Sequence, residues 1–274
     1  MFVPRPHRRL PLRPIVVACA LLPLLAGRAA AQPVPDATLA VPAETFLGDA
    51  VTFTVTFDNT SAADTGYGPF VDLIFPVNGA DGAAGTDVAD GLDFSSATFR
   101  GQPVTSVELT FPGPGPIGCV AHPYAVDAAH SPLQVCGTPG DKLVVLQLPF
   151  GSFSPDQPPA VISVDATATN LADLGTPLPI RTRAGFQFGA DPLDVPAGDP
   201  TILSPGDSAI DSSTWTESAT NAPTLLSLAK ANDATESETA TGPNYPRTWT
   251  ITVDIATGQT ITAFEVHDFL PDNA

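Results

Sequence analysis

The most regular stretch of this sequence is Val51-Thr52-Phe53-Thr54-Val55-Thr56-Phe57. Its odd positions are large and apolar, and its even positions are all threonine. A period of two predicts a β-strand with one buried face and one face toward water. The turn-forming residues Asp58-Asn59-Thr60 follow directly and are expected to end the strand.

Similar segments recur along the chain between turn signals. They are rich in Val, Ile, Thr and Phe, and no stretch shows sustained helical periodicity with capping residues. The 31 prolines and 22 glycines also favour many turns over long helices. Further strands are expected at 70–75, 106–111, 143–148, 160–168 and 183–188. The pattern predicts an all-β fold, an Ig-like β-sandwich.

The first 31 residues have the features of a secretory signal peptide. Residues 1–14 contain four arginines and no acid, residues 15–26 are apolar, and Ala29-Ala30-Ala31 is a small-residue cleavage site. The apolar run is too short to span a membrane, which needs roughly 20 residues. We therefore expect a secreted, extracellular protein at the cell surface, with no membrane span in this chain.

The charge of the chain is strongly acidic. It carries 11 basic and 29 acidic residues, and removal of residues 1–31 would take five of the arginines away. Such a surface repels nucleic acids and anionic lipids. Nucleic acid is therefore excluded as a partner.

The chain divides by composition into four parts. After the signal peptide at 1–31, residues 36–202 are expected to form the N-terminal β-sandwich, and the polar segment 203–223 to form a linker. A second series of strands, at 224–228, 249–255 and 262–266, repeats the order of the first. Because three strands are too few for a sandwich, 224–274 is expected to be the start of a second, truncated Ig-like module.

The second series carries a resemblance to known proteins. The residues Gly242-Pro243-Asn244-Tyr245-Pro246 lead into the alternating strand, which is followed by Asp268-Phe269-Leu270-Pro271. This arrangement resembles the conserved-repeat and isopeptide-forming fimbrial modules of bacterial surface proteins. The resemblance implies Ig-like sandwiches arrayed end to end in a structural or adhesive role, with neighbouring repeat modules or an unidentified surface ligand as partners.

The same resemblance draws attention to Lys230. In such modules a lysine on the first strand forms a spontaneous amide bond with an Asn or Asp on a late strand. The reaction needs a desolvated, neutral amine. Lys230 is therefore the candidate isopeptide lysine, with a partner expected beyond Ala274. The alternative is a solvated lysine at a strand edge.

The two cysteines that follow the signal peptide, Cys119 and Cys136, are expected to form a disulfide in an oxidising compartment. With His122 and His130 they also make up a set of zinc-ligand types. Because zinc needs thiolates and export favours their oxidation, we expect the disulfide and no metal.

No cofactor motif is present, and one acidic loop is a candidate calcium site. Asp81, Asp87, Asp90 and Asp93 lie among glycines, although their spacing is not that of an EF-hand. The alternative is an ordinary exposed turn.

The sequence predicts no catalytic residues and no enzyme. Gly206-Asp207-Ser208 and Asp127-Ala128-Ala129-His130 resemble two blocks of a lipase/esterase family, but in reversed order, and no expected strand positions Ser208. We expect a non-enzymatic, structural or adhesive surface protein. The alternative is a carbohydrate-binding module attached to a larger secreted enzyme, which exposed aromatic residues would favour.

Overall fold

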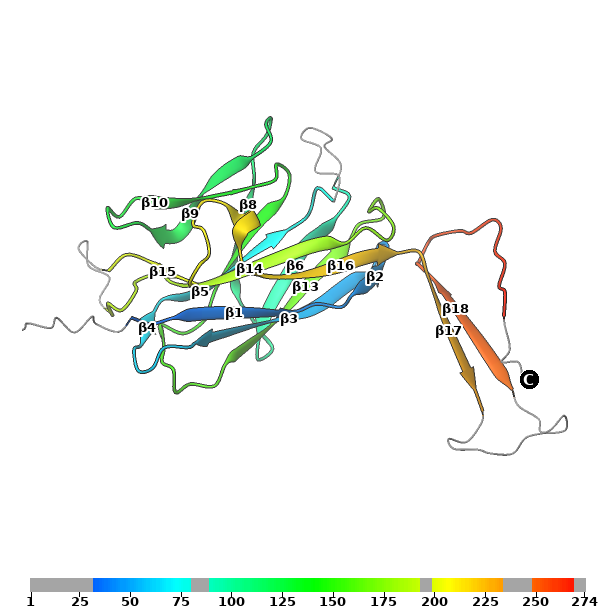
Figure 1. Ribbon diagram of the computed structural model, residues 1–274, viewed down its shortest axis with the longest axis horizontal. Coiled ribbons are helices and arrows are strands. Elements are labelled where there is room, and N and C mark those ends of the chain that lie inside the picture. Colours follow the sequence, from blue (N-terminus) through cyan, green and yellow to red (C-terminus); the bar gives the residue numbers. More distant parts are fainter. Residues whose placement is uncertain (1–31, 80–88, 193–198, 234–247, 269–274) are drawn as a thin grey trace, which may run out of the picture. The chain divides into compact units, whose positions relative to one another are not determined.

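The computed structural model of the chain describes residues 32–79, 89–192, 199–233 and 248–268 (Figure 1). The expected signal peptide at 1–31 lies outside these ranges. Within them the secondary structure consists of β-strands and one short 3-10 helix, η1 (Ser212–Thr214). The predicted all-β fold is confirmed. None of the described residues forms a helix long and apolar enough to cross a membrane.

The first sheet of the sandwich contains the alternating stretch with which the sequence analysis began. That stretch is the centre of β3 (Ala50–Asn59), and its Val and Phe side chains are buried. In antiparallel order the sheet runs β1 (Pro35–Ala40), β3, β13 (Ala160–Ala168), β6 (Leu92–Phe99) and β7 (Gln102–Pro103). Alternation along β3 and β13 places one face of this sheet in the core.

The second sheet faces the first across the main core. Its order is β2 (Glu44–Phe46), β16 (Glu217–Thr224), β14 (Leu178–Phe186), β5 (Pro69–Phe75), β11 (Lys142–Gln147) and β8 (Thr105–Thr110). A short strand, β15 (Ile202–Leu203), pairs with β14. Only the β2–β16 pair is parallel among those described in this sheet.

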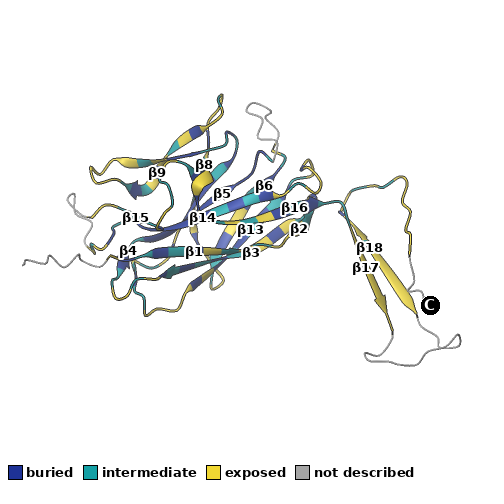
Figure 2. Ribbon diagram, in the orientation of Figure 1, coloured by how far each residue is buried: buried dark blue, intermediate teal, exposed yellow. Residues whose placement is uncertain are grey.

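A third layer covers the outer face of the second sheet. It consists of the hairpin β9 (Gly118–Val126) and β10 (Pro132–Gly137), together with the segment around η1. Every residue of β5 is therefore buried (Figure 2). Its odd residues, including Leu73, face the main core, whereas Phe70 and Ile74 pack under the third layer. A strand covered on both faces explains why 70–75 does not alternate and is apolar at every position except Asp72.

A small ladder closes one end of the sandwich. Strand β4 (Gly66–Tyr67) pairs with β12 (Ser152–Phe153), and the Phe153 ring meets Phe57 edge to face at 5.2 Å. Phe57 also meets Phe186 of the second sheet at 5.6 Å. These aromatic contacts join the two sheets through the core.

The segment 203–223 differs from the expected linker. It contains η1 and most of β16, which pairs with β14 from Thr182↔Glu217 to Leu178↔Asn221. Trp215, which the sequence placed in the linker, is 4% exposed. The polar composition of this segment is typical of a loop. Its Ser, Thr and Asp side chains nevertheless form hydrogen bonds within the protein, which keep the segment in the sandwich.

Beyond β16 the chain forms a two-stranded hairpin, β17 (Leu226–Asn232) and β18 (Trp249–Ile255). Both strands were expected, β18 with these bounds. Residues 262–266, also expected as a strand, are irregular in the structure. One face of the hairpin carries Leu228, Ile251 and Ile255, which are 55%, 37% and 42% exposed. A two-stranded ribbon alone cannot bury that face.

Candidate functional site

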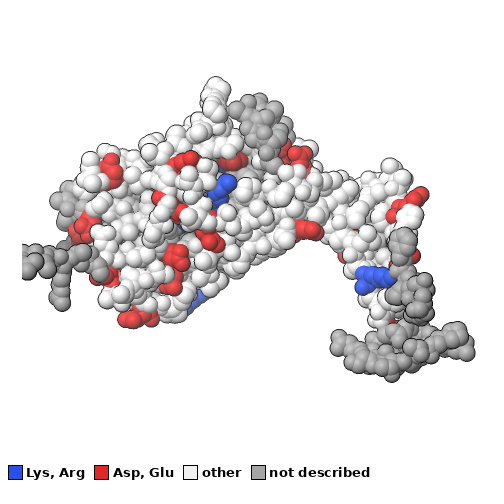
Figure 3. Space-filling view, in the orientation of Figure 1, with Lys and Arg blue, Asp and Glu red and all other residues white. Residues whose placement is uncertain are grey.

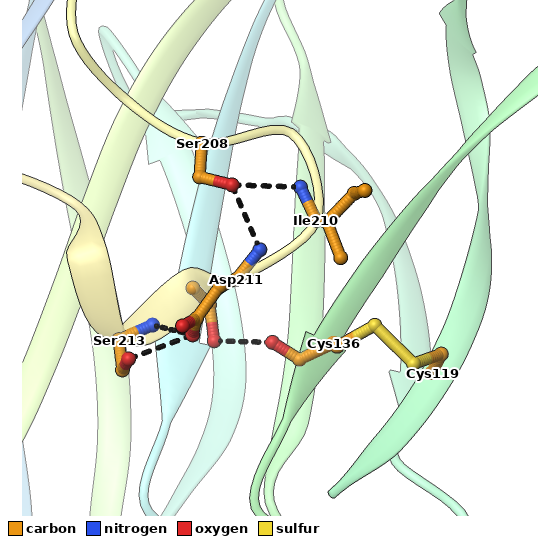
Figure 4. The surroundings of a disulfide bond; sticks show 7 residues. Cys119, Cys136, Ser208, Ile210, Asp211 and Ser213 are labelled. Carbon is orange, nitrogen blue, oxygen red and sulfur yellow. Dashed lines mark hydrogen bonds between the residues drawn. A yellow bond between two sulfur atoms is a disulfide. The ribbon is translucent and has the colours of Figure 1, made fainter.

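The most constrained part of the surface is the third layer, where Cys119 of β9 and Cys136 of β10 form a disulfide. The two residues are opposite each other in the hairpin register (Figure 4). The carbonyl oxygen of Cys136 accepts a hydrogen bond of 2.8 Å from the Ser212 hydroxyl, and Cys136 forms a bridge with Asp211. The disulfide predicted from the sequence is thus present, and the backbone of Cys136 also bonds to the segment around η1.

With both sulfurs in the disulfide, the zinc site considered from the sequence has no thiolate ligands. His122 is buried and His130 is exposed on the β9–β10 turn, so the four residues do not converge. Within the described ranges, no cluster of three or more His, Cys, Asp or Glu side chains is arranged to hold a metal ion.

Ser208 has a structural role in the loop before η1. Its hydroxyl oxygen accepts hydrogen bonds from the backbone N–H groups of Ile210 and Asp211, at 3.1 and 3.0 Å (Figure 4). Asp211 in turn caps η1 by accepting from Ser213. The esterase-like arrangement is therefore not formed, because no described histidine contacts Ser208.

A charged network that sequence reasoning missed lies beneath the third layer. Asp72 of β5 bonds His122 through one carboxylate oxygen and Arg183 of β14 through the other, each at 2.8 Å. All three side chains are fully buried. Burial alone raises the pKa of Asp72, but the contacts with His122 and Arg183 outweigh it and hold this pKa below its ordinary value.

The tautomer of His122 follows from its contacts. Its Nδ1 accepts hydrogen bonds from the backbone N–H groups of Tyr124 and Ala125, at 3.0 and 2.7 Å. Nε2 therefore carries the proton and donates it to Asp72. Both ring nitrogens are occupied within the protein, so His122 has no free nitrogen for a substrate. A His–Asp pair of this kind orients the β9 backbone and does not act as a general base.

Arg183 extends the network to the segment around η1. Its guanidinium lies 4.3 Å from the centre of the Trp215 ring and donates to the Ser208 carbonyl oxygen at 2.9 Å. The Trp215 indole N–H donates to the same oxygen. The network thus connects β5, β9, β14 and the η1 segment, and it fixes how the third layer sits on the sheet.

A second buried carboxyl group, Asp141, lies just before β11. It is 8% exposed and accepts a hydrogen bond of 3.1 Å from the backbone N–H of Asn78. Burial raises its pKa to about 7, against the opposing effects of the Asn78 bond and the charge of Arg181. Because the pKa of Asp141 is higher in the folded than in the unfolded chain, its protonated form stabilises the fold. This contribution is complete below the ordinary pKa of an aspartate and is lost as the pH rises through about 7.

The Asp141→Asn variant should gain stability relative to the unmodified chain as the pH rises. The amide keeps the Asn78 bond but cannot ionise, so the difference in unfolding free energy should grow by about 2 kcal/mol between pH 5 and pH 8. Urea unfolding at the two pH values measures it. Asp173→Asn, at an exposed position, controls for loss of one charge. A difference independent of pH would contradict the assignment.

Lys230 lies on β17 and is exposed in the hairpin. Its ammonium group forms an ion pair with Asp268 and lies 4.5 Å from the centre of the Trp249 ring. A carboxylate and an aromatic face both favour the charged ammonium. The described contacts are those of an ion-paired ammonium group on an exposed hairpin. The isopeptide bond predicted from the sequence stays a prediction.

The candidate calcium loop falls largely outside the described residues. Asp81 and Asp87 lie in 80–88, of which the structure says nothing. Asp93 is described and forms a 2.7 Å ion pair with Lys142 on β11, which also contacts Glu108. Asp93 is thus engaged by a cation of the protein itself.

Comparison with known proteins adds little to this picture. No protein-family model and no curated protein matches the sequence. One similar solved structure is a cohesin module from a Clostridium perfringens family 33 glycoside hydrolase, with 10% identity over 63% of this chain and 96% of that one, and a TM-score of 0.32. Another is a C-terminal fragment of the major pilin GBS80 of Streptococcus agalactiae, with 10% identity over 72% of this chain and 57% of that one, and a TM-score of 0.31.

A third is AvmM, which catalyses macrocyclization in alchivemycin A biosynthesis, with 16% identity over 70% of this chain and 88% of that one, and a TM-score of 0.33. The three include both non-catalytic modules and an enzyme, and scores this low carry no argument about function. The strands, their order and the buried core define the chain as an all-β protein with an Ig-like sandwich.

Proposed function

We propose that the chain is a secreted, non-enzymatic surface module with a structural or adhesive role. The observation that carries this proposal is the use of its polar groups. Among the described residues, the buried histidine His122 has both ring nitrogens bonded within the protein. The Asp72 carboxylate that it contacts is also bonded to Arg183, and this network holds the third layer in place. These buried polar side chains therefore stabilise the packing of the third layer on the sheet, and a rigid fold suits a surface module.

Export is supported by the disulfide and by the acidic charge. A Cys119–Cys136 bond persists in an oxidising compartment and is rare where thiols are kept reduced. An excess of 29 acidic over 11 basic residues keeps such a module soluble and away from nucleic acid. Figure 3 shows acidic side chains spread over the visible face and basic ones at few places.

A modular organisation is supported by the β17–β18 hairpin. It follows β16 directly, and Leu228, Ile251 and Ile255 on its apolar face are exposed. This is the pattern of one sheet of a sandwich before its partner layer is added. We propose that 32–224 forms the first module and that 225–274 begins a second Ig-like module. Lys230 would become buried there, as an isopeptide lysine requires.

Expression of the chain in a bacterial host should give an exported protein whose first residue is Gln32. The physical reason is the order of positive, apolar and small residues in 1–31. N-terminal sequencing and the intact mass of exported protein measure the outcome.

The control is a variant with Ala29 and Ala31 replaced by arginine, which removes the small residues of the cleavage site and should stay uncleaved. Retention of the unmodified chain in the cytoplasm with Met1 intact would overturn the proposed function.

A further inference from the structure

Two hollows lie side by side at one end of the sandwich, where β5 and β13 begin and β6, β11 and β14 end. One has a volume of about 310 Å³ and the other about 180 Å³. Phe150, in the loop after β11, lines both. This end, here called the aromatic end, is the one opposite to the exit of β16 toward β17, as the β14–β16 register shows.

Aromatic rings form the floor of the two hollows. The Phe150 ring lies 5.7 Å from Phe99 and 5.5 Å from Phe153, which fixes its position between them. Phe188 lines the larger hollow. Phe99, Phe150 and Phe188 are all half-buried, so part of each ring faces solvent. Half-exposed rings held by their neighbours offer rigid apolar surface at small entropic cost.

Amide side chains stand at the rim of the larger hollow. Gln147 and Gln187 both line it, and neither amide group forms a hydrogen bond with the described residues. Gln147 is exposed and Gln187 is half-buried. Each amide group can donate two hydrogen bonds and accept two. The aromatic rings are thus bordered by donors and acceptors that the described part of the chain does not use.

A basic side chain, Arg100, lies at the smaller hollow. Arg100 lines it, is exposed and forms no ion pair with the described residues, and its guanidinium lies 5.2 Å from the centre of the Phe99 ring. The other described basic side chains are placed differently. Lys142, Arg183 and Lys230 form ion pairs with carboxylates, and Arg181 is half-buried within range of the Asp141 charge.

The backbone at Arg100 adds a second observation. Arg100 and Gly101 form the two-residue turn between β6 and β7, with φ values of 51° and 75°. Turns of this type favour Asn, Asp or Gly at the first position, because a left-handed conformation strains other side chains. An arginine held in that conformation at the edge of a hollow points to a role for its charge.

We propose that the aromatic end binds an oligosaccharide that carries a single carboxylate, with a sugar ring packed on Phe150 and the carboxylate paired with Arg100, because the acidic chain as a whole repels polyanions. The proposal rests on the proposed surface function and names its ligand class. Ring CH groups of a sugar contact aromatic faces, hydroxyl groups bond to the Gln147 and Gln187 amides, and a guanidinium pairs with a carboxylate in a two-bond geometry. A neutral apolar ligand would leave Arg100 and both amides unused.

The test is calorimetric titration of the whole, disulfide-bonded chain with an acidic oligomer, a glucose oligomer that carries one terminal glucuronic acid. Glucose oligomers of the same length are the neutral control ligand, and a proline-rich peptide tests the other occupant that an aromatic groove could take. The acidic oligomer should bind at least about tenfold more tightly than the neutral one, because one charge-assisted pair is worth about that factor. Added salt should reduce the difference.

The variants locate the site. Arg100→Gln should weaken binding of the acidic oligomer about tenfold and leave the neutral oligomer unaffected. Phe150→Ala should weaken both about fivefold or more. Arg181→Gln removes the same charge elsewhere and should change neither. Equal binding of both oligomers, tighter binding of the peptide, no binding of the acidic oligomer or insensitivity to Arg100→Gln would each overturn the proposal. Export with cleavage before Gln32 is a separate readout, so the proposed function can stand or fail independently.

Discussion

Replacing Asp72 with alanine is expected to lower the free energy of unfolding by about 3–5 kcal/mol, the largest effect that we expect of a single substitution in this chain. The variant leaves the Arg183 guanidinium fully buried with no counter-charge, and it removes the acceptor of the His122 Nε2–H. An unpaired buried charge costs far more than the net contribution of the intact pair. Urea unfolding at pH 7, followed by Trp215 fluorescence, measures the loss.

A double-mutant cycle separates the cost of the unpaired charge from other effects. Asp72→Leu combined with Arg183→Met should lose much less stability than the sum of the two single variants, because no charge stays unpaired. The matched surface control is Asp93→Asn, which breaks a partly exposed pair with Lys142 and should cost about 1 kcal/mol or less. Additive losses in the cycle would show that the two side chains are not coupled.

The strand pattern was the part of the fold that could be predicted from sequence. Val51 to Phe57 alternates because β3 lies at the outside of the sandwich, with one face in the core and one toward water. Its threonines also find partners, since Thr52 bonds Asp165 of β13 at 2.7 Å. The same reasoning gave β13 and β18 their correct bounds. Period-two alternation works wherever a strand has one wet face.

The third layer could not be predicted in the same way. Neither β9 nor β10 alternates regularly between buried and exposed residues, so no period of two marks residues 118–137. Likewise the polar segment 203–223 resembled a linker because it packs through Trp215 and backbone hydrogen bonds rather than through an apolar stripe. The structure of such segments depends on tertiary contacts, which leave no periodic pattern in the local sequence.

The buried charges left a signal in the sequence that was not used. Asp72 interrupts the apolar run 70–75, and Arg183 stands at the start of an expected strand. A carboxylate and a guanidinium in two strands of one core must pair or be neutralised, because an isolated buried ion is too costly. That rule would have suggested their contact, though not the part played by His122. The hollows around Phe150 are lined by five separate segments, and no spacing along the chain predicts them.

The rigidity of the sandwich supports the proposed ligand binding at the aromatic end and the proposed connection to a second module at the opposite end. Aromatic rings at Phe57, Phe153 and Phe186 lock the sheets together next to the aromatic end. A binding surface on such a support loses little entropy when a ligand binds. The exit of β16 toward the hairpin lies at the other end, so attachment and recognition would not compete for the same surface.

Removing the disulfide, with serine at both Cys119 and Cys136, is expected to lower the free energy of unfolding by about 3 kcal/mol. The bond closes a loop with a sequence separation of 17 residues, and the loop-entropy relation gives that value for loops of this length. The loss should be concentrated in the third layer, because Cys136 also accepts the Ser212 hydrogen bond next to Trp215. The Trp215 emission should therefore shift to the red before the sandwich unfolds, whereas the far-ultraviolet signal of the sheets should persist.

Reduction of the unmodified chain is the matched control and should reproduce the behaviour of the double-serine variant, since both remove the same crosslink. A thiol assay on the unreduced, denatured, exported chain should find no free cysteine. Two free thiols would contradict the bond itself. Unchanged stability of the variant would instead show that the Asp72–His122–Arg183 network alone suffices to hold β9 and β10 on the sheet. In that case combining the variant with Asp72→Ala should detach the layer, because the two changes remove both the crosslink between β9 and β10 and the buried contact of His122 in β9 with Asp72 in β5.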